Sequence, residues 1–470
     1  MLPDLGSRAI AVRMADPQMP APQLSWPARL RFASGDFACN LYWQSSSLFL
    51  FFYYTDILHL APEVAGVIYM IGSVWDGVAD LLAGIWAERG HRDYARVVGF
   101  GAVPLGLAFP LLYFAPPFQG AAFLAVLLIA QFAFRSLYAL VNIPYVAWSA
   151  RISTDSRDRA AIAGLRMLFG TLAAVTVSLA TERISLAVSG TPTSIPGFLC
   201  AAALFALIAT PLLIHVARRS PQGAGGRAAG VPPTPLLRGL AALATNRAFV
   251  TLCIAMICVA IAATMLSRSV LYYFTYIVRD ETAGTTALAL MGVAGSLFVP
   301  LWMLARHRIG SRALWLGAVA LAIAASTAFA LADSGAAWRA DLFLVTIQAA
   351  LAAFNFVFWA MMPDTVEYGE YHGGVRVEAL CFGVAALLQK ISIGVATAIT
   401  GFAYSAIGYT PQVAQSPGVI TGIRWIMVAA PIIGCLLSAL AMAANPLRRD
   451  THRRIVATLA QRAEKIRPSA

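Results

Sequence analysis

The first chemically informative feature of this 470-residue chain is a set of carboxylates inside apolar stretches. Asp36 lies in one stretch, and Asp76 and Asp80 lie four residues apart in the next. A spacing of four places two side chains on the same face of a helix. Neighbouring carboxylates resist a second negative charge, so this pair is a poor structural device and a good ligand for a cation or a proton.

These carboxylates need partners if they lie in a membrane, where each unpaired one costs about 2.5–3.5 kcal/mol at the bilayer centre. The sources of positive charge are a bound cation or Arg135, Arg166, Arg268 and Lys390 in other apolar stretches. Lys390 is unusual because only two of the 34 basic residues are lysines. The alternatives to a functional site are that these charges form static ion pairs, that Asp36 lies nearer the membrane surface, and that the Lys390 side chain extends to the membrane–water interface.

The composition indicates which kind of element must position these residues. The chain is 59% hydrophobic and 12% charged, with a mean hydropathy of +0.73. A soluble domain carries about 25% charged residues, so a soluble enzyme, a disordered chain and a disulfide-rich secreted domain are excluded. A β-barrel would need alternating segments of about ten residues, which are absent. An all-α membrane protein remains.

Twelve segments are long enough to cross a membrane, which takes about 20 apolar residues. They span roughly 31–56, 63–87, 95–115, 119–150, 160–188, 195–217, 242–278, 284–305, 313–332, 340–362, 379–408 and 419–445.

The twelve segments divide into two similar halves. Short basic turns follow the second and the eighth segment, GIWAERGHR (84–92) and LWMLARHRIGSR (301–312), which predicts a parallel repeat of two six-helix bundles. The predicted units are an N-terminal tail (1–30), a first bundle (31–217), a linker rich in glycine and proline (218–241), a second bundle (242–445) and a basic tail (446–470).

The distribution of basic residues predicts the orientation in the cell membrane. The two tails and the even-numbered loops hold most of the 34 basic residues, and the odd-numbered loops and segment edges hold only Arg183, Arg279, Arg339 and Arg424. Both termini are therefore expected to be cytoplasmic. The net charge of +12 is a topology signal, so no nucleic acid is expected as a partner, whereas the basic C-terminal tail is expected to lie on anionic lipid.

No cofactor is expected. The six histidines lie at segment ends, in loops or in the tail, so haem or quinone ligation inside the membrane lacks its ligands, and there is no nucleotide-binding signature. The sequence establishes no metal site, and the candidate it offers is a sodium ion bound by Asp76 and Asp80.

Four segments carry a more specific resemblance. They are GDFACNLYWQSSSLFLFFYYTD (35–56), IGSVWDGVADLLAG (71–84), NIPYVAWSARISTDSRDRAAIAGLRMLFG (142–170) and MMPDTVEYGEYHGGVRVEALCFGVAALLQK (361–390). Together they resemble the glycoside–pentoside–hexuronide:cation symporters, a family of the major facilitator superfamily, and the turn at 84–92 is similar to a loop of that superfamily. The resemblance implies the major facilitator fold.

The resemblance also implies residue roles. Asp76 and Asp80 match two acids that bind the coupling cation, and Lys390 matches a lysine near them. Asp36 and Arg166 match an acid and an arginine that contact sugar hydroxyls. The rest of the implied sugar pocket is Tyr138, which matches an aromatic residue, Asn142 in place of a second acid, and Trp148, two residues after the Val146 that replaces a stacking tryptophan.

The coupling ion is predicted from what surrounds the two acids. A sodium-using member of the family supplies neutral oxygens where this chain has Ala79 and Ala139. Sodium requires several oxygen ligands, whereas a proton requires one carboxylate whose protonation a neighbouring carboxylate favours. A proton is therefore favoured over sodium, although backbone carbonyls or Asn142 could complete a sodium site.

Two polar loops, 151–159 and 364–378, occupy equivalent places in the two halves. They are predicted to form a cytoplasmic gate by exchanging ion pairs, the alternative being two separately solvated loops. The basic residues are Arg151, Arg157, Arg159 and Arg376, and the acidic ones are Asp364, Glu367, Glu370 and Glu378.

The sequence therefore predicts a monomeric, cation-coupled symporter of a sugar, a glycoside or a similar small polar solute. A transporter of another substrate such as a lysolipid, and a non-transporting sensor or assembly factor, are the alternatives. A membrane-embedded enzyme would need a nucleophile and base or a metal centre, and the sequence offers neither.

Overall fold

The computed structural model describes residues 24–89, 93–153, 156–221, 236–332, 335–375 and 377–448, together with a few positions between 451 and 461. These residues form helices and connecting turns without a strand. The first half contains α1 (Trp26–Phe52) with the π-turn η1 (Tyr53–Ile57), α2 (Pro62–Arg89), α3 (Tyr94–Ala108) with the short η2 (Pro110–Tyr113), α4 (Gly120–Arg151), α5 (Ser156–Ser189) and α6 (Ile195–Arg219).

The second half contains α7 (Leu236–Thr245), α8 (Arg247–Tyr273) with the π-turn η3 (Phe274–Val278), α9 (Glu281–Leu297), α10 (Val299–Ile309), α11 (Ser311–Ala332), α12 (Ala337–Gly373), α13 (Glu378–Ala406) and α14 (Pro417–Ala443). Helix α7 begins inside the segment predicted as a linker.

Ten described helices are long and apolar enough to cross a membrane, and α9 with α10 adds an eleventh if the bent pair counts as one span. The pair bends by 40° near Phe298, because Pro300 in the first turn of α10 has no N–H to continue the helical ladder. Helix α1 has the length of a span and carries Asp36 among its polar residues. This set is consistent with the twelve predicted spans.

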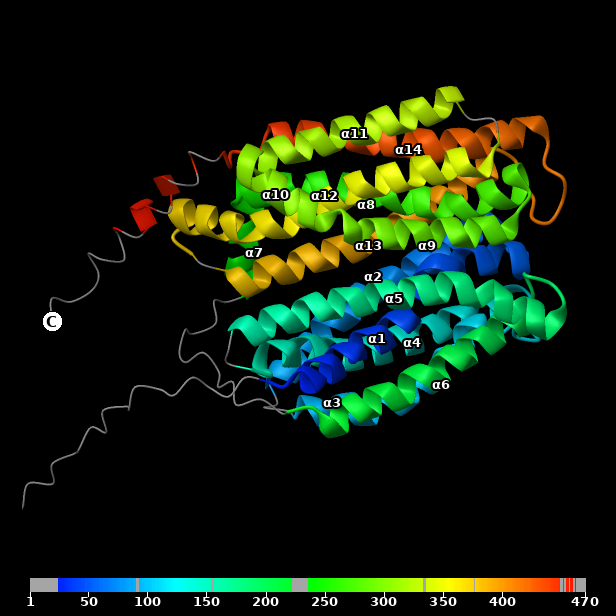
Figure 1. The fold of residues 1–470 in the computed structure, drawn as a ribbon, viewed down its shortest axis with the longest axis horizontal. Helices are drawn as coiled ribbons and strands as arrows, with labels where there is room; N and C mark the ends of the chain where they lie inside the picture. Colours follow the sequence, from blue (N-terminus) through cyan, green and yellow to red (C-terminus); the bar gives the residue numbers. More distant parts are fainter. Residues whose placement is uncertain are drawn as a thin grey trace, which may run out of the picture.

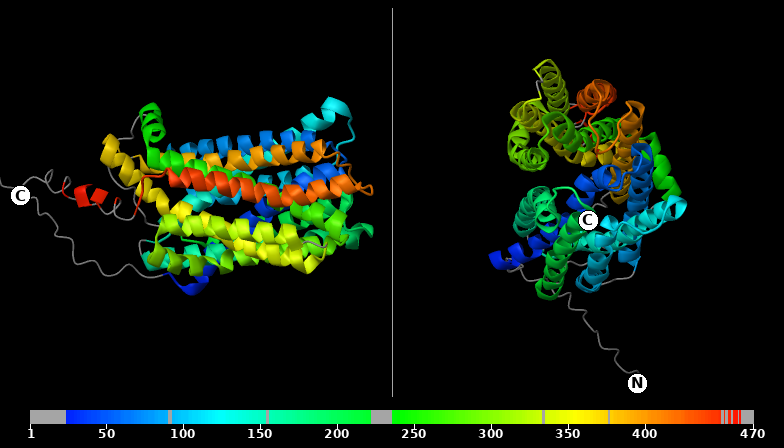
Figure 2. Two further views of the ribbon diagram at one scale, coloured as in Figure 1. Left: turned by 90° about the horizontal axis from the view of Figure 1, so that it is seen from above. Right: turned by 90° about the vertical axis from the view of Figure 1, so that its right-hand side faces the viewer.

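The helices form two bundles that lie side by side (Figures 1 and 2). Helices α1–α6 make one bundle and α7–α14 the other. Helix α1 begins and α14 ends at the same end of the molecule, on the left in Figure 1, which is called the terminal end below. The opposite end is called the far end. Helix α2 packs along α13, and α5 along α9, across the boundary between bundles.

The α2–α13 contact depends on small residues. A Cβ atom added at Gly66 would lie 2.9 Å from the Ala398 Cα. A Cβ added at Gly394 would lie 2.8 Å from the Ser73 Cβ and 3.1 Å from the Met70 carbonyl oxygen. Without water to drive association, helices in membranes join through such close backbone packing.

The N-terminal end of α1 is attached to the start of α5 through Asp158, which is fully buried and lies before the membrane span. The Asp158 carboxylate accepts hydrogen bonds from the Leu24 N–H at 2.9 Å and the Ser153 hydroxyl at 2.8 Å, and Arg29 lies 2.6 Å away. Burial by itself raises the pKa of this carboxyl, but the two hydrogen bonds and the Arg29 charge outweigh it and lower the pKa.

Replacing Gly394 with alanine is expected to separate α2 from α13 and to lower stability by about 1–3 kcal/mol, the usual effect of an extra methyl group in a tightly packed contact. Gly383→Ala is the matched control, because it lies on the same helix and an added Cβ meets nothing within 4 Å. Thermal unfolding of the detergent-solubilised protein measures the difference. Equal stability of the two variants would contradict this account of the contact.

Asp158 predicts a defined pH dependence. Because its pKa is lower in the folded state than the unfolded value of about 3.9, its stabilising effect is complete above about pH 5 and is lost as the pH falls below about 4. The stability difference between the wild type and Asp158→Asn should therefore be constant from pH 8 to 5 and smaller at pH 3.5. Asp93→Asn is the control, since asparagine caps a helix as well as aspartate does. A difference that stays constant down to pH 3.5 would refute the assignment.

Candidate functional site

A charge cluster joins the two bundles at the α2–α13 contact. The Lys390 ammonium of α13 lies 2.7 Å from the Asp76 carboxylate and is in direct contact with the Asp80 carboxylate, both on α2. Arg135 of α4 approaches Asp76 at 3.6 Å. The structure therefore brings together the two acids and the lysine that the sequence singled out, and of the other possible sources of positive charge it places Arg135 beside them.

The cluster is shielded from water and held in place by its neighbours. Asp76 is 1% exposed, whereas Asp80 and Lys390 retain 19% and 17%. The Ser73 hydroxyl donates to the Lys390 carbonyl oxygen at 2.8 Å, and the Lys390 nitrogen lies 5.3 Å from the centre of the Trp43 ring. Two carboxylates facing two cations make the cluster electrically balanced.

The lysine occupies the position between the carboxylates that a bound metal ion would need. The flank of the cluster is apolar, because Ala79, Ala83 and Ala139 form one buried group with Ile143 packed against it. The described residues contain no group of three or more metal-ligating side chains. In this conformation Lys390 bridges the two carboxylates.

A second ion pair lies between α1 and α5. The Arg166 Nε and Nη2 atoms both donate to one oxygen of Asp36 at 3.0 Å, and its Nη1 donates to the Ser149 hydroxyl at 3.0 Å. Asp36 and Arg166 retain 15% and 19% exposure. Both belong to the wall of a cavity, so they are available to a ligand.

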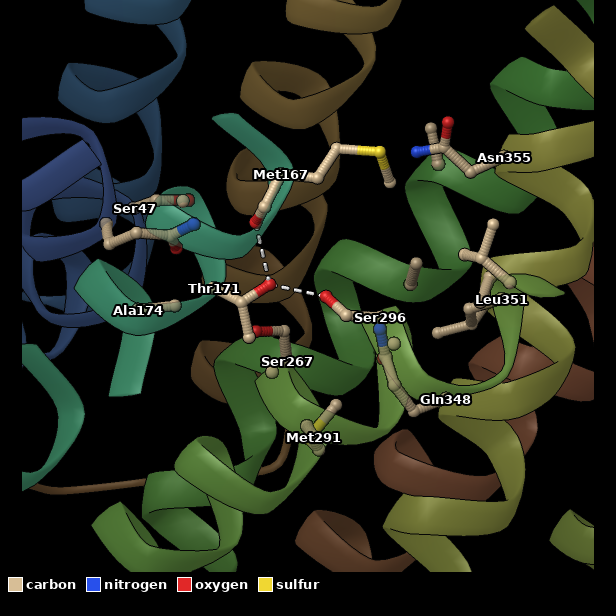
Figure 3. A pocket seen from close by; sticks show the side chains of 18 of the residues that line it. Ser47, Met167, Thr171, Ala174, Ser267, Met291, Ser296, Gln348, Leu351 and Asn355 are labelled. Atoms are coloured by element: carbon tan, nitrogen blue, oxygen red, sulfur yellow. Dashed lines mark hydrogen bonds between the residues drawn. The ribbon is translucent and has the colours of Figure 1, made fainter. Parts of the chain in front are cut away.

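That cavity measures about 920 Å³ and lies between the bundles, with walls from α1 and α5 on one side and α8, α9, α12 and α13 on the other. Figure 3 shows Thr171 of α5 facing Ser296 of α9, and their hydroxyls share a hydrogen bond across the boundary. The cavity also carries uncharged polar side chains from both bundles, namely Asn40, Gln44, Ser47, Thr171, Ser267, Ser296, Gln348 and Asn355. Its size and lining suit a small polar solute.

Three predicted members of the sugar pocket are not among the residues that line the cavity. Tyr138 is buried and stacks on Trp43 with ring centres 6.0 Å apart. Asn142 is half-buried one turn further along α4. The Trp148 side chain is 1% exposed, and its N–H donates to the Pro221 carbonyl at 3.0 Å. Helix positions two residues apart differ in direction by about 200°, so the Trp148 side chain points to a different side of α4 from Val146 and cannot replace a residue at that position.

The predicted loop 364–378 is largely helical, which corrects the sequence interpretation. Helix α12 continues through Pro363 to Gly373 and ends at Gly374, whose φ of 65° is left-handed. Proline removes a single helical hydrogen bond, and helices in membranes tolerate that loss. The acidic gate residues Asp364, Glu367 and Glu370 thus lie on the last turns of a helix.

The basic residues of the predicted gate, and one of its acids, lie outside what the structure describes. This applies to the side chains of Arg151, Arg157 and Arg159, to the Glu378 side chain, and to Arg376 as a whole. The exchange of ion pairs at this gate stays a prediction.

The sequence analysis missed a polar cluster that closes the far end. Asp56, at the end of η1, accepts hydrogen bonds from the hydroxyls of Tyr276 and Tyr409, each at 2.6 Å, and from the Thr55 hydroxyl at 2.7 Å. Thr55 also shares a hydrogen bond of 2.5 Å with the Tyr272 hydroxyl. Asp56 belongs to the first bundle and the tyrosines to the second. The Asp56 carboxylate and the Thr55 hydroxyl therefore both link the two bundles at the far end.

The position of Asp56 two residues after the aromatic run FFYY (51–54) was the available signal in the sequence. Its tyrosine partners lie more than 200 residues away, so they could not be identified without the fold.

Comparisons with known proteins agree with this architecture. A family model described as MFS/sugar transport protein matches residues 31–449. The isoprimeverose transporter of Lactiplantibacillus pentosus is 25% identical over 426 residues, which cover 89% of this chain and 88% of that protein. The glucuronide carrier protein homolog of Escherichia coli K12 is 26% identical over 449 residues, covering 94% and 96%.

The solved structure of a bacterial homolog of the human lysosomal transporter Spinster superposes with a TM-score of 0.69 at 14% identity, over 92% of this chain and 99% of that one. Likeness at this identity shows the fold alone. Together with the family model it confirms the predicted all-α major facilitator fold in a multi-pass membrane protein.

The Asp56 cluster predicts how the far end opens. Asp56→Asn removes the charge from hydrogen bonds that hold the bundles together, which should shift the equilibrium toward an open far end by about 1.5–3 kcal/mol. Spin labels at the exposed Thr191 and Val413, in a background without native cysteines, report the separation of the bundles. The distance distribution should move to longer distances. Asp280→Asn, at the same end and capping α9, is the control, and an identical distribution in both variants would rule out the latch.

Proposed function

The chain belongs to the family of MFS/sugar transport proteins, and on this premise we propose that it carries a sugar or glycoside across a cell membrane together with a cation, by alternating access between its two bundles. The observation that carries the proposal is the placement of a solute-sized cavity and a buried, exchangeable charge cluster at the same boundary between bundles. The family match identifies a transporter rather than an enzyme, as the sequence predicts.

The solute class is supported by the lining of the cavity and by the relatives. Amide and hydroxyl side chains from both bundles offer donors and acceptors to sugar hydroxyls, and the Asp36–Arg166 pair adds charged ones. The relatives named above are a transporter of isoprimeverose and a homolog of a glucuronide carrier protein. We assign the solute to the cavity and the coupling ion to the neighbouring charge cluster.

The coupling ion in this proposal is a proton. The Lys390 ammonium occupies the centre of the Asp76–Asp80 pair, and Ala79 and Ala139 supply no oxygen on the flank where a sodium ion would need one. Protonation of one carboxylate weakens its attraction for Lys390 and frees α13 to move relative to α2. Proton uptake and relative movement of the bundles are thereby linked at one contact.

The proposal includes an orientation and a state of assembly. The terminal end faces the cytoplasm, because the basic residues of the even loops and tails belong on that side. The basic C-terminal tail contacts anionic lipid. The transporter works as a monomer, because one chain supplies both the cavity and the charge cluster.

Gradients imposed on proteoliposomes test the coupling. A panel of labelled sugars is offered with an inward pH gradient in sodium-free buffer, and separately with a sodium gradient at constant pH. We expect accumulation with the pH gradient. Accumulation driven by sodium alone would overturn proton coupling, and no uptake of any sugar would contradict the proposed solute class.

Variants of the charge cluster locate the coupling site. Asp76→Asn or Asp80→Asn should reduce gradient-driven accumulation to equilibration, about a onefold concentration ratio, while counterflow exchange of the solute persists, because exchange requires no net proton movement. Asp93→Asn, outside the membrane spans, should behave as the wild type. Full accumulation in either cluster variant would place the coupling elsewhere.

A further inference from the structure

One buried cation beside the central cavity has no anionic partner among the residues that the structure describes. Arg268 of α8 lines the cavity, and its side chain is 4% exposed. Arg166 is paired with Asp36, and Arg135 and Lys390 share Asp76. Arg268 forms no such ion pair within the described residues, and its Nε and Nη1 atoms have no hydrogen-bond partner.

The surroundings of Arg268 add positive charge. Its guanidinium lies 4.5 Å from the centre of the Tyr69 ring, and the guanidinium of Arg135 lies 5.3 Å from the same ring. Two arginines, one from each bundle, thus converge on one tyrosine of α2. The Nη2 atom of Arg135 also lacks a hydrogen-bond partner, and Asp76, with which Arg135 forms an ion pair, is already in contact with Lys390.

A buried cation without an anion is unfavourable, because burial removes its hydration and an aromatic face replaces only part of it. A static structural role would be served better by a paired or an apolar residue. The arrangement is understandable if the missing anion arrives with the ligand. Guanidinium groups bind carboxylate and sulfonate oxygens through charge-assisted hydrogen bonds, which are the strongest available to a small solute.

We propose that Arg268 binds an anionic group of the transported solute, so that the preferred substrate is an acidic sugar or glycoside carrying a carboxylate or a sulfonate. The inference rests on the proposed function, and it narrows the substrate class within the same cavity. The Asp36–Arg166 pair and the amides then face the neutral hydroxyls, and the Arg268 side of the cavity receives the charge. Because Arg268 comes from the second bundle and Asp36 from the first, an acidic solute links both bundles when it binds.

Matched pairs of sugars test this directly on the purified full-length protein in detergent. The probes are methyl β-glucoside with methyl β-glucuronide, methyl β-galactoside with methyl β-galacturonide, and the 6-deoxy-6-sulfo analogue of each sugar, with titration calorimetry as the measurement. At least one acidic member should bind about tenfold more tightly than its neutral partner. The uronide and sulfo arms distinguish carboxylate from sulfonate recognition.

Arg268→Gln should weaken binding of the acidic sugar about 10- to 100-fold and leave binding of the neutral sugar unchanged. Arg268→Lys should retain part of the preference, because the charge remains and the planar geometry is lost. Arg308→Gln, at an exposed position of α10, is the matched control and should change neither affinity.

The outcomes separate this inference from the proposed function. Equal or tighter binding of the neutral sugars, or an acidic preference that survives Arg268→Gln, overturns the inference and leaves sugar transport intact. Binding of none of these sugars overturns both. Thermal unfolding of the sugar-free protein excludes a purely structural role: Arg268→Gln should be as stable as the wild type or more stable, since it removes an unpaired buried charge. A large loss of stability together with loss of neutral-sugar binding would also overturn the assignment.

Discussion

The structure depends on one ammonium group held between two carboxylates inside the membrane. Lys390 forms ion pairs with Asp76 and Asp80 at once, and those three residues come from helices of different bundles. Removal of the lysine from either acid would leave a charge in a medium that cannot hydrate it, so the state of this contact and the relative position of the bundles are coupled. A transporter needs such coupling between ion occupancy and the arrangement of its halves.

The contact forms because the helices that carry it approach closely. Small residues at Gly66, Ser73 and Gly394 let α2 and α13 pack backbone against backbone. Larger side chains here would hold the acids too far from the lysine for a direct contact. Beside this contact, Ala79 of α2 and Ala139 of α4 belong to one small buried apolar group, so the α4 side of the cluster is apolar.

Charge is distributed unevenly around the central cavity. One wall holds a complete ion pair, Asp36 with Arg166, and the side nearest Arg268 holds a cation without an anion. The bundles are linked at the far end by hydrogen bonds instead of ion pairs, because the Asp56 carboxylate accepts hydrogen bonds from two tyrosine hydroxyls of the other bundle. Hydrogen bonds of this kind can break and reform as the bundles move, because each hydroxyl finds another partner in water once the end opens.

The sequence by itself determined the fold class and a number of spans with which the structure is consistent. It also identified the two acids of the charge cluster, Asp76 and Asp80, and their lysine, Lys390. Those features are local, because hydrophobic segments of sufficient length must span a membrane and charges within them are too costly to be incidental. Only the tertiary structure decided the partners. The orientation of Trp148 away from the cavity, the helical course of α12 past Pro363, the tyrosines around Asp56 and the unpaired state of Arg268 depend on which helix faces meet. The physical reason is that pairing of buried polar groups is set by contacts between residues hundreds of positions apart, and hydrophobic patterning does not encode the rotation of one helix against another.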